Sequence, residues 1–306
     1  MFGAFFPAAH MSKHFAKPTQ SILAPGRRAL CLFALAALGW SSRMHAQSGS
    51  QIVVGIVPYL SARRLVELYE PLRALLAQVL ARPVVLETAS DYREFLSRTA
   101  LGRYDLIATS PYFGRLAQLE QGYVPLARPL TDLEPLLVVQ KNGGPATLAE
   151  LRGRVITTSD ALANLTLSAM RYLSAHGLVP GRDIEVRATG SHANSLAALE
   201  RGDSVAAVVS TSALTQVGGD WTNRVQVLAR MEAVTPLLYL VHQRTSEADQ
   251  NRLRLAMLTF ANDTPAGKQF SANLGHGGLR PIRVQDMSTL DSFVEELKNQ
   301  LKGDKH

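Results

Sequence analysis

Short apolar runs alternate along the chain with longer stretches in which apolar residues recur every three or four positions. Apolar runs of about four to eight residues are typical of buried strands, and the longer recurrence is typical of amphipathic helices. The pattern predicts strands at 51–57, 84–87, 104–108, 155–157, 184–187 and 205–209. It predicts helices at 65–79, 91–101, 112–121, 147–152, 162–176, 193–201, 249–260, 266–274 and 290–301. Strands that alternate with helices of about 10–15 residues predict an α/β fold, in which parallel sheets carry helices on both faces.

Two segments about a hundred residues apart repeat one pattern. Residues 102–110 and 202–210 each follow a helical pattern, cross a short apolar run and end in hydroxyl side chains before the next helix. The repeat predicts two lobes, each a mostly parallel sheet flanked by helices, facing one another across a cleft. Apolar segments at 133–140 and 236–241 are expected to carry the chain between the lobes as two crossover strands. We therefore expect lobe 1 at 47–136 plus 237–306 and lobe 2 at 137–236.

Three local signals refine the helices. Pro71 interrupts the first helical pattern and is expected to kink or split that helix. Gly177 directly follows the helix at 162–176 and is a typical C-cap residue. The last helix carries one apolar stripe, made of Leu290, Phe293, Val294, Leu297 and Leu301. We expect this helical tail to pack back on lobe 1, which makes lobe 1 discontinuous in sequence.

The first 46 residues have the layout of an export leader. They hold five basic residues and no acidic one, and Arg27-Arg28 precedes an apolar run at 29–40. This run is too short to span a bilayer, which takes about 20 helical residues. Small residues follow it, so we expect a secretory signal peptide at 1–46 that is cleaved after Ala46. The expected location is the periplasm; an uncleaved N-terminal anchor is the alternative.

Removal of this leader changes the charge balance. The chain has 32 Lys and Arg against 25 Asp and Glu, and without the five leader cations 27 basic residues remain. No basic stripe with interleaved aromatic residues is left, so no nucleic-acid partner is expected. The single cysteine, Cys31, lies within the leader. The mature chain therefore offers no disulfide, no thiolate nucleophile and no cysteine metal site.

The motifs of common catalytic and metal sites are missing from the sequence. No His-Glu-x-x-His, Gly-x-Ser-x-Gly, Gly-x-x-x-x-Gly-Lys or Gly-x-Gly-x-x-Gly pattern occurs. Nothing in the chain stands out as a nucleophile or a general base. We therefore predict a binding protein rather than an enzyme, with no cofactor and no metal.

Small hydroxyl residues recur where the predicted strands end. In open α/β sheets a ligand lies beyond the carboxyl ends of the strands, and each helix N-terminus carries roughly half a positive charge. Several such ends aimed at one cleft would hold a small oxyanion or a polar zwitterion without an arginine. The expected ligand-binding residues are Tyr59, Ser110, Tyr112, Thr157, Thr158, Ser159, Ser191, His192, Ser210 and Thr211.

Each of these residues also has an ordinary structural explanation. Ser and Thr favour helix N-caps and turns in any protein, and only their recurrence at several strand ends favours a site. Tyr59 and Tyr112 either wall the cleft or pack in the core. His192 either contacts the ligand or serves as a surface or capping residue. We expect His276, within Gly275-His-Gly-Gly278, to be an ordinary loop residue.

A succession of short motifs covers most of residues 50–245. In lobe 1 these are Val54-Gly-Ile-Val-Pro58, Pro71-Leu72, Pro83-Val84, Asp91-Tyr92, Gly102-x-x-Asp105-Leu106 and Ser110-Pro111. In lobe 2 they are Leu148-x-x-Leu151-Arg-Gly153-x-Val155 and Gly190-Ser191-His192. This order resembles the phosphate/phosphite/phosphonate-type (PhnD-like) periplasmic solute-binding proteins of ABC importers. The resemblance implies a type II periplasmic-binding-protein-like fold, whose two lobes close on a ligand like a hinged clamp.

The chain departs from these relatives where the resemblance places phosphonate binding. Their Ser/Thr-rich run before the first main helix of lobe 2 reads Thr157-Thr-Ser-Asp160 here, and Asp160 would repel an anion if it faced the cleft. The acid that follows the histidine in those proteins is Ala193 here. The expected ligand is therefore a phosphonate, phosphite or phosphate, another small oxyanion, or an organic solute.

Two functions use such a clamp. The first is a monomeric substrate-binding subunit of an ABC importer, which presents a small-molecule ligand to a permease in the inner membrane. The alternative is a periplasmic sensor that reports the same ligand to a receptor histidine kinase. A lobed transferase or hydrolase is disfavoured because no reactive group stands out.

Overall fold

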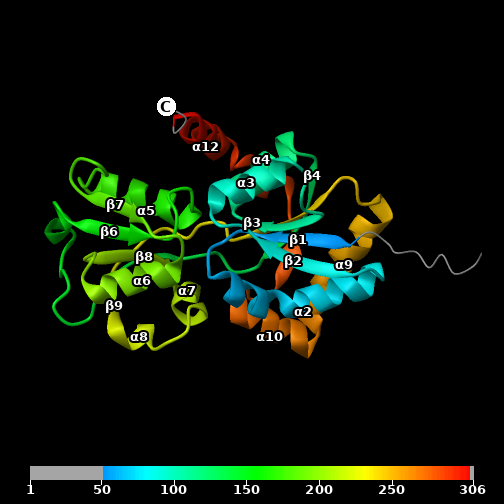
Figure 1. The fold of residues 1–306 in the computed structure, drawn as a ribbon, viewed down its shortest axis with the longest axis horizontal. Coiled ribbons are helices and arrows are strands. Elements are labelled where there is room, and N and C mark those ends of the chain that lie inside the picture. Colours follow the sequence, from blue (N-terminus) through cyan, green and yellow to red (C-terminus); the bar gives the residue numbers. More distant parts are fainter. Residues whose placement is uncertain (1–50, 304–306) are drawn as a thin grey trace, which may run out of the picture. The chain divides into compact units, whose positions relative to one another are not determined.

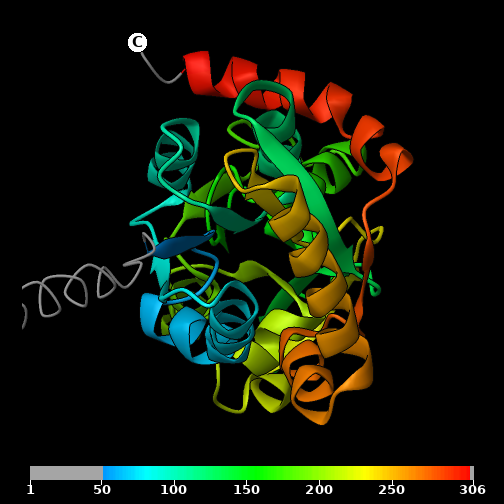
Figure 2. The ribbon, with the colours of Figure 1, turned by 90° about the vertical axis from the view of Figure 1, so that its right-hand side faces the viewer.

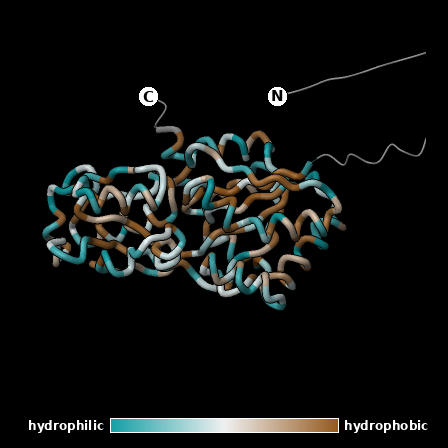
Figure 3. Tube along the Cα trace, turned by 60° about the horizontal axis from the view of Figure 1, so that its bottom comes forward, coloured by the Kyte–Doolittle hydropathy of each residue, from teal (hydrophilic) through white to brown (hydrophobic). Residues whose placement is uncertain are grey.

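The computed structural model describes residues 51–303 of the 306-residue chain. The predicted leader at 1–46 therefore lies outside the described residues. Of the helices described, none is long and apolar enough to cross a membrane. Hydrophobic residues gather along the inner strands, and hydrophilic residues cover much of the outer helices and loops (Figure 3).

Six strands form the first sheet. They are β1 (Ile52–Ile56), β2 (Val84–Thr88), β3 (Leu106–Thr109), β4 (Tyr123–Pro129), β10 (Leu238–His242) and β11 (Leu279–Pro281). Their order across the sheet is β11-β4-β10-β3-β1-β2. β1, β2 and β3 are parallel, as predicted, whereas β10 runs antiparallel to both β3 and β4. The sheet is therefore mixed.

The second sheet has five strands and repeats this plan. They are β5 (Pro135–Gln140), β6 (Val155–Thr158), β7 (Glu185–Ala188), β8 (Ala206–Ser210) and β9 (Val225–Arg230), in the order β7-β6-β8-β5-β9. β6, β7 and β8 are parallel, and β5 is antiparallel to its neighbours β8 and β9. This order corresponds strand by strand to β2-β1-β3-β10-β4 of the first sheet. The repeated sequence pattern at 102–110 and 202–210 thus forms equivalent strands, β3 and β8.

Each sheet contains one inner strand that follows, in sequence, a strand of the other sheet. After β4 the chain crosses at 130–134 and enters the second sheet as β5. After β9 it crosses back at 231–237 and enters the first sheet as β10. The two crossings pair with one another, because the backbones of Leu133 and Val234 form an antiparallel bridge. The extended segments predicted to connect the lobes therefore also supply a central strand to each sheet.

Helices cover both faces of the first sheet (Figures 1 and 2). One face is covered by α2 (Ala62–Leu80), α9 (Glu247–Asp263) and α10 (Pro265–Leu274), with one buried hydrophobic cluster beneath them. The other face is covered by α3 (Tyr92–Ala100), α4 (Pro111–Glu120), α11 (Val284–Ser288) and α12 (Asp291–Gly303), above a second cluster. Leu290, Val294 and Leu297 are buried in that second cluster. The helical tail thus packs back on the first sheet, as its apolar stripe predicts.

The second sheet is covered in the same way. On one face, α5 (Asn164–Ala175) and the 3₁₀ turn η2 (Leu148–Leu151) bury a cluster that includes Leu151, Leu165 and Leu173. On the other face lie α6 (His192–Arg201), α7 (Thr211–Gln216) and α8 (Trp221–Arg224). α5 ends at Ala175 with His176 as its C-cap, and Gly177 follows directly with a φ of 77°, which fits its predicted role in ending the helix.

α2 runs without interruption through Pro71, so of the two expected outcomes, a kink or a split, the split does not occur. A proline inside a helix costs about 3 kcal/mol, because it removes one hydrogen bond and crowds the preceding turn. The buried stripe of α2 outweighs this cost. It consists of Leu65, Leu68, Tyr69, Leu72 and Leu76. A buried leucine contributes about 1.5–3 kcal/mol relative to an exposed one, so burial on both sides of the proline keeps the helix continuous.

β4 is absent from the predicted strands because Pro125 and Pro129 lie within it. Proline lacks the N–H that a central strand donates and therefore argues against such a strand. In the structure, β4 lies between β10 and β11, and its pairing with β10 shifts register between Tyr239 and Leu240, opposite Pro125. This irregularity accommodates the missing donor.

Gly55 in β1 leaves room for a packed aromatic ring. A Cβ at Gly55 would approach ring carbons of Tyr104 to 2.5 Å. That ring stacks on Phe95 with centroids 5.3 Å apart, and the Tyr123 hydroxyl donates to the Tyr104 carbonyl at 2.8 Å. The ring is thus held against the backbone of β1, where only glycine fits.

We predict that Gly55→Ala lowers the free energy of unfolding by about 1–3 kcal/mol, because the Tyr104 ring must leave its packed position. Urea denaturation measures this change. Tyr104→Ala on the same chain removes the clash, so the double variant should lose less stability than the sum of the two single variants. Additive losses would show that the ring does not limit the residue at position 55.

Candidate functional site

A cavity lies between the two sheets, and both contribute to its lining. On the first-sheet side it is bounded by the residues after β1 and β3 and by the loop after α10, and on the second-sheet side by the starts of α5, α6 and α7. The crossings at 130–134 and 231–237 close it at one side. The space open to the centres of water molecules is about 80 Å³. A cavity needs at least about 10–15 Å³ to hold one water, so this space has room for several waters or one small solute.

Two long helices begin at this cavity without a side-chain cap. They are α4, whose N-cap is Ser110 on the first sheet, and α5, whose N-cap is Ala163 on the second. In contrast, α2, α3, α6, α9 and α10 are each capped by a Ser, Thr or Asp side chain. The first-turn N–H groups of α4 and α5 have no partner within their helices, and each N-terminus carries roughly half a positive charge. The two helices therefore offer one anion-attracting terminus from each sheet.

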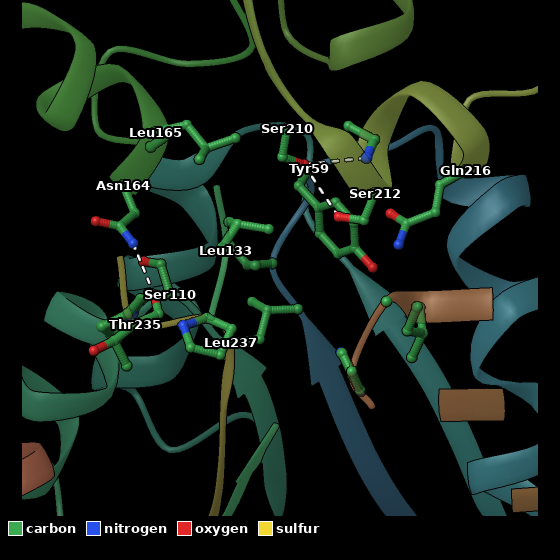
Figure 4. A pocket seen from close by; sticks show the side chains of 18 of the residues that line it. Tyr59, Ser110, Leu133, Asn164, Leu165, Ser210, Ser212, Gln216, Thr235 and Leu237 are labelled. Atoms are coloured by element: carbon green, nitrogen blue, oxygen red, sulfur yellow. Dashed lines mark hydrogen bonds between the residues drawn. The ribbon is translucent and has the colours of Figure 1, made fainter. Parts of the chain in front are cut away.

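Four buried side-chain atoms beside the cavity have no hydrogen-bond partner in the described protein. They are Ser110 Oγ, Asn164 Oδ1, His192 Nδ1 and His276 Nδ1, on residues that are only 4–7% exposed. An unpaired buried polar atom costs about 1–3 kcal/mol. Their gathering around one space indicates a ligand that supplies the missing partners. Asn164 is held in place because its Nδ2 donates to the Thr235 carbonyl at 3.0 Å (Figure 4).

Both cavity histidines are neutral at physiological pH. Burial lowers the pKa of His192 to about 4, although a backbone hydrogen bond to Val208 acts in the opposite direction. Burial alone lowers the pKa of His276 to about 3. A neutral imidazole carries one donor and one acceptor nitrogen, so each ring can pair with a polar ligand group without adding charge.

No lysine or arginine lines the cavity within residues 51–303. Its one carboxylate, Asp132, forms an ion pair with the buried Arg128. Asp160, which was expected to repel an anion if it faced the cleft, is not part of the lining; its carboxylate accepts from the Leu162 N–H at 2.8 Å. An anion in this cavity would therefore rest on helix N-termini and neutral donors rather than on a cation.

Polar and apolar contacts join the two sides around the cavity. Arg64 Nε on α2 donates to the carbonyl of Gln216 at the end of α7 at 2.8 Å. The His192 N–H donates to the Tyr59 carbonyl at 3.5 Å. Residues at the start of α5, among them Ala163, pack into the hydrophobic cluster that covers the first sheet. The cavity is thus enclosed by contacts between the two halves.

Four of the ten predicted ligand-binding residues line the cavity. They are Tyr59, Ser110, His192 and Ser210. Ser110 and Ser210 end the equivalent strands β3 and β8 and begin α4 and α7, as the repeated pattern predicts. Ser210 Oγ already accepts from the Ala213 N–H at 3.1 Å and lies 3.1 Å from Ser212 Oγ.

The other six predicted residues do not line this cavity. Thr157 and Thr158 are buried below it, where their hydroxyls bond within the second sheet and its helices. Ser191 caps α6, and Thr211 donates to Glu134 at 3.1 Å. Ser159 is fully buried with an unpartnered Oγ. Tyr112 stacks on Phe293 and lines a second cavity between α4, α5 and α12.

Several lining residues were missed by sequence reasoning. His276, expected to be an ordinary loop residue, is 4% exposed and lines the cavity. Asn164 lies two residues inside the start of the helix predicted at 162–176 and is the first residue of α5. Leu133, Gln216 and Leu237 lie on the crossings or at a helix end, where no local sequence signal distinguishes them. Only the packing of the two halves brings these residues together.

Comparison with known protein families identifies the family to which the chain belongs. The family model of periplasmic substrate-binding proteins of phosphonate ABC transporters matches residues 54–287, which include both sheets. The chain belongs to this family. Members of this family are solute-binding components of ABC transporters, so the cavity between the sheets is the candidate ligand site and a sensor role is not favoured.

Solved structures share the fold. A binding protein component of an ABC phosphonate transporter from Pseudomonas aeruginosa is 14% identical, with a TM-score of 0.70 over 84% of this chain and 99% of that chain. PhnD1 from Prochlorococcus marinus in complex with methylphosphonate is 14% identical, with a TM-score of 0.70 over 81% and 98%. The alkanesulfonate-binding protein SsuA from Xanthomonas axonopodis pv. citri, bound to MOPS, is 21% identical, with a TM-score of 0.58 over 83% and 94%. Among curated protein sequences, none matches the chain.

We predict that the substrate-binding protein loses stability as the pH falls from about 6.5 to 4. The unfolded chain takes up protons on both histidines near pH 6.5, whereas the folded protein does so only near pH 4 at His192 and pH 3 at His276. The unfolded state therefore binds more protons in this window, and the free energy of unfolding falls by up to about 1.4 kcal/mol per pH unit for each histidine. Urea denaturation between pH 8 and pH 5 measures the slope.

His276→Gln separates packing from protonation. At pH 8 the variant reports only the loss of packing, and at pH 5 it also lacks the proton penalty. The free energy of unfolding of the variant, relative to that of the parent, should rise by about 2 kcal/mol from pH 8 to pH 5. An unchanged difference would mean that His276 is not neutral and buried in solution.

Proposed function

We propose that the protein binds, between its two halves, a small solute with an oxyanion head group and presents it to the permease of an ABC importer. The head group lies between the N-termini of α4 and α5. Ser110, His192, Ser210 and Tyr59 contact the solute, together with Asn164 and His276. The solute is bound and released unchanged, the mature protein is an exported periplasmic monomer, and the leader at 1–46 directs its export.

One observation carries this proposal: of the three helices of ten or more residues that begin at the cavity, α6 is capped by Ser191, whereas α4 and α5 lack a side-chain cap. Helix N-termini bind anions through free N–H groups and the helix dipole. The unpartnered Ser110 Oγ, 5% exposed, supplies a donor at the first of them. The Asn164 side chain lies at the second, where its Nδ2 is already used by Thr235. A ligand oxyanion can thus accept from the Ser110 hydroxyl and from the first-turn N–H groups of both helices, whereas the open Asn164 Oδ1 is itself an acceptor.

The fold relatives support the same class of head group. One is described in complex with methylphosphonate, and another is an alkanesulfonate-binding protein. Phosphonate and sulfonate groups both present three oxygens on a tetrahedral centre. The neutral lining and the two helix N-termini suit this geometry without a cation.

We predict that Ser110→Ala weakens the binding of methylphosphonate or methanesulfonate about 10- to 100-fold, because a hydrogen bond to a charged group contributes about 1.5–3 kcal/mol. Isothermal titration calorimetry of the purified mature protein measures the affinity. A thermal-shift assay gives a second readout, because saturation at a hundredfold the dissociation constant adds about 2.7 kcal/mol to stability.

Ser246→Ala is the matched control. Ser246 caps α9 through its side chain and does not line the cavity. Its removal should cost about 1 kcal/mol of stability with no change in affinity. If phosphonates, phosphite, phosphate and sulfonates all failed to bind the parent protein, the proposed function would be wrong. Equal affinities of parent and Ser110→Ala would remove Ser110 from the site.

We further propose that the two sheets with their helices move as lobes, with lobe 1 at 47–136 plus 237–306 and lobe 2 at 137–236. The paired crossings at Leu133 and Val234 form the hinge. The tail helix α12 then belongs to lobe 1 but reaches lobe 2. Phe293 stacks on Tyr112 with centroids 4.8 Å apart, and the Arg171 guanidinium on α5 lies 4.1 Å from the Phe293 ring centroid. This contact stabilises the closed arrangement.

We predict that Phe293→Ala lowers ligand affinity about two- to fivefold without touching the cavity, because an exposed cation–π contact contributes about 0.5–1 kcal/mol to the closed state. Titration calorimetry measures the affinity, and small-angle scattering of the ligand-free protein measures the shift towards the open form. Arg171→Ala should have a similar effect, and the double variant should lose less than the sum. Strictly additive effects would show that these two side chains do not act through one contact.

A further inference from the structure

The cavity has two polar ends separated by apolar side chains. Figure 4 shows Ser110, Asn164 and Thr235 at one side and Ser210, Ser212 and Gln216 at the other, with leucine side chains between them. The first side contains the N-termini of α4 and α5, where the oxyanion is proposed to bind. The second side lies at α7, and we call it the amide end after the side chain of Gln216. A solute that fills the cavity from the oxyanion end therefore places its body along the leucines and its far atoms near Gln216.

The amide end has no carboxylate. Asp132 is the one acidic residue that lines the cavity within the described residues, and it is paired with Arg128. A cation contacts the amide end from α2, where Arg64 Nε donates to the Gln216 carbonyl at 2.8 Å; the Glu134 carboxylate near the start of α7 is paired with Arg230. Arg64 is partly balanced by Glu67 at 3.3 Å, on the exposed side of α2. A buried ammonium group would find only neutral partners here.

We propose that the solute carries its charge on the oxyanion head group alone and has an uncharged, partly apolar body. This inference rests on the proposed function and specifies the substrate class of the same cavity. Leu133, Leu165 and Leu237 pack along the body of the solute, and the Gln216 amide faces its end (Figure 4). Solutes with a second, cationic group at that end are discriminated against.

The physical reason is that burial lowers the free energy of apolar groups and raises that of unpaired charged groups. Each methylene that moves from water to the leucines contributes favourably. An ammonium group loses its hydration and gains no counter-ion, and a buried unpaired charge is strongly unfavourable. The cavity lining extends beyond the oxyanion end to the leucines and Gln216, so the body of the solute contributes to recognition.

Two isosteric pairs of small molecules test this inference with the native protein. Propylphosphonate and 2-aminoethylphosphonate differ only by a terminal methyl against an ammonium group, which is charged near pH 7. Propanesulfonate and 2-aminoethanesulfonate repeat the comparison with a head group of fixed charge. We expect the propyl member of a bound pair to bind at least tenfold more tightly in titration calorimetry. Equal or tighter binding of the amino compounds would overturn the inference.

Methylphosphonate and phosphite are the reference ligands. If they bind but the amino compounds bind as well as the propyl compounds, the inference fails and the proposed function stands. If no oxyanion binds at all, the proposed function fails and the inference with it. Propylphosphonate is also expected to bind more tightly than methylphosphonate, and the opposite order would contradict the apolar packing of the body.

Gln216→Glu locates the end of the solute. This substitution is nearly isosteric and supplies a carboxylate at the amide end, so the ratio of the propyl to the amino affinity should fall at least fivefold. Gln216→Met is the matched neutral control and should keep the preference for the propyl compound. An unchanged ratio in Gln216→Glu, with the fold intact by circular dichroism, would overturn the placement of the solute's far end beside α7.

Discussion

The reciprocal exchange of β5 and β10 is the constraint on which the cleft depends. β5 lies beside β8 with Pro135 opposite Ser210, and β10 lies beside β3 with Leu238 opposite Thr109. Each exchanged strand therefore starts where the neighbouring strand ends in hydroxyl residues. Because the two crossings also pair with one another, the hydroxyl-bearing ends of β3 and β8 are held next to the same connection. The cavity forms there because the carboxyl ends of both parallel sets meet at this edge.

The same arrangement explains why so many polar groups are left without partners in a buried place. Most buried polar groups of a folded protein are hydrogen-bonded, and each exception is costly. Thr157 shows the usual solution, since its hydroxyl bonds to Ser195 and Ala206 carbonyls inside the second half. In contrast, Ser110 Oγ and the Nδ1 atoms of the two cavity histidines have no hydrogen-bond partner in the described protein. The protein keeps neutral, unpaired donors and acceptors at the cavity, and the stability lost there is offset by four hydrophobic clusters on the faces of the two sheets.

Neutrality of the site sets its selectivity in physical terms. Helix N-termini favour an anion within their first turn and provide no comparable partner for a cation. A cavity with one such terminus on each side, and with its single carboxylate already paired to Arg128, favours one negative group and an uncharged remainder. The proposed closure of the two lobes would act on affinity from outside the cavity, through contacts between the halves such as Arg64 with Gln216.

The sequence by itself determined the strands β1, β2, β3, β6, β7 and β8, most of the helices, the repeated plan of the two halves and the hydroxyl-bearing strand ends, because apolar periodicity and capping residues are local signals. It left open whether Pro71 kinks or splits α2, which stays continuous, and it missed β4, since in both places packing outweighs the local preference of proline. Only the tertiary structure decided which polar residues face the cavity. Thr157 and Ser110 look alike in sequence, yet one is satisfied inside a sheet and the other is left open. His276 and Gln216 join the site from distant loops and helix ends, because the exchange of two strands folds the chain back on itself.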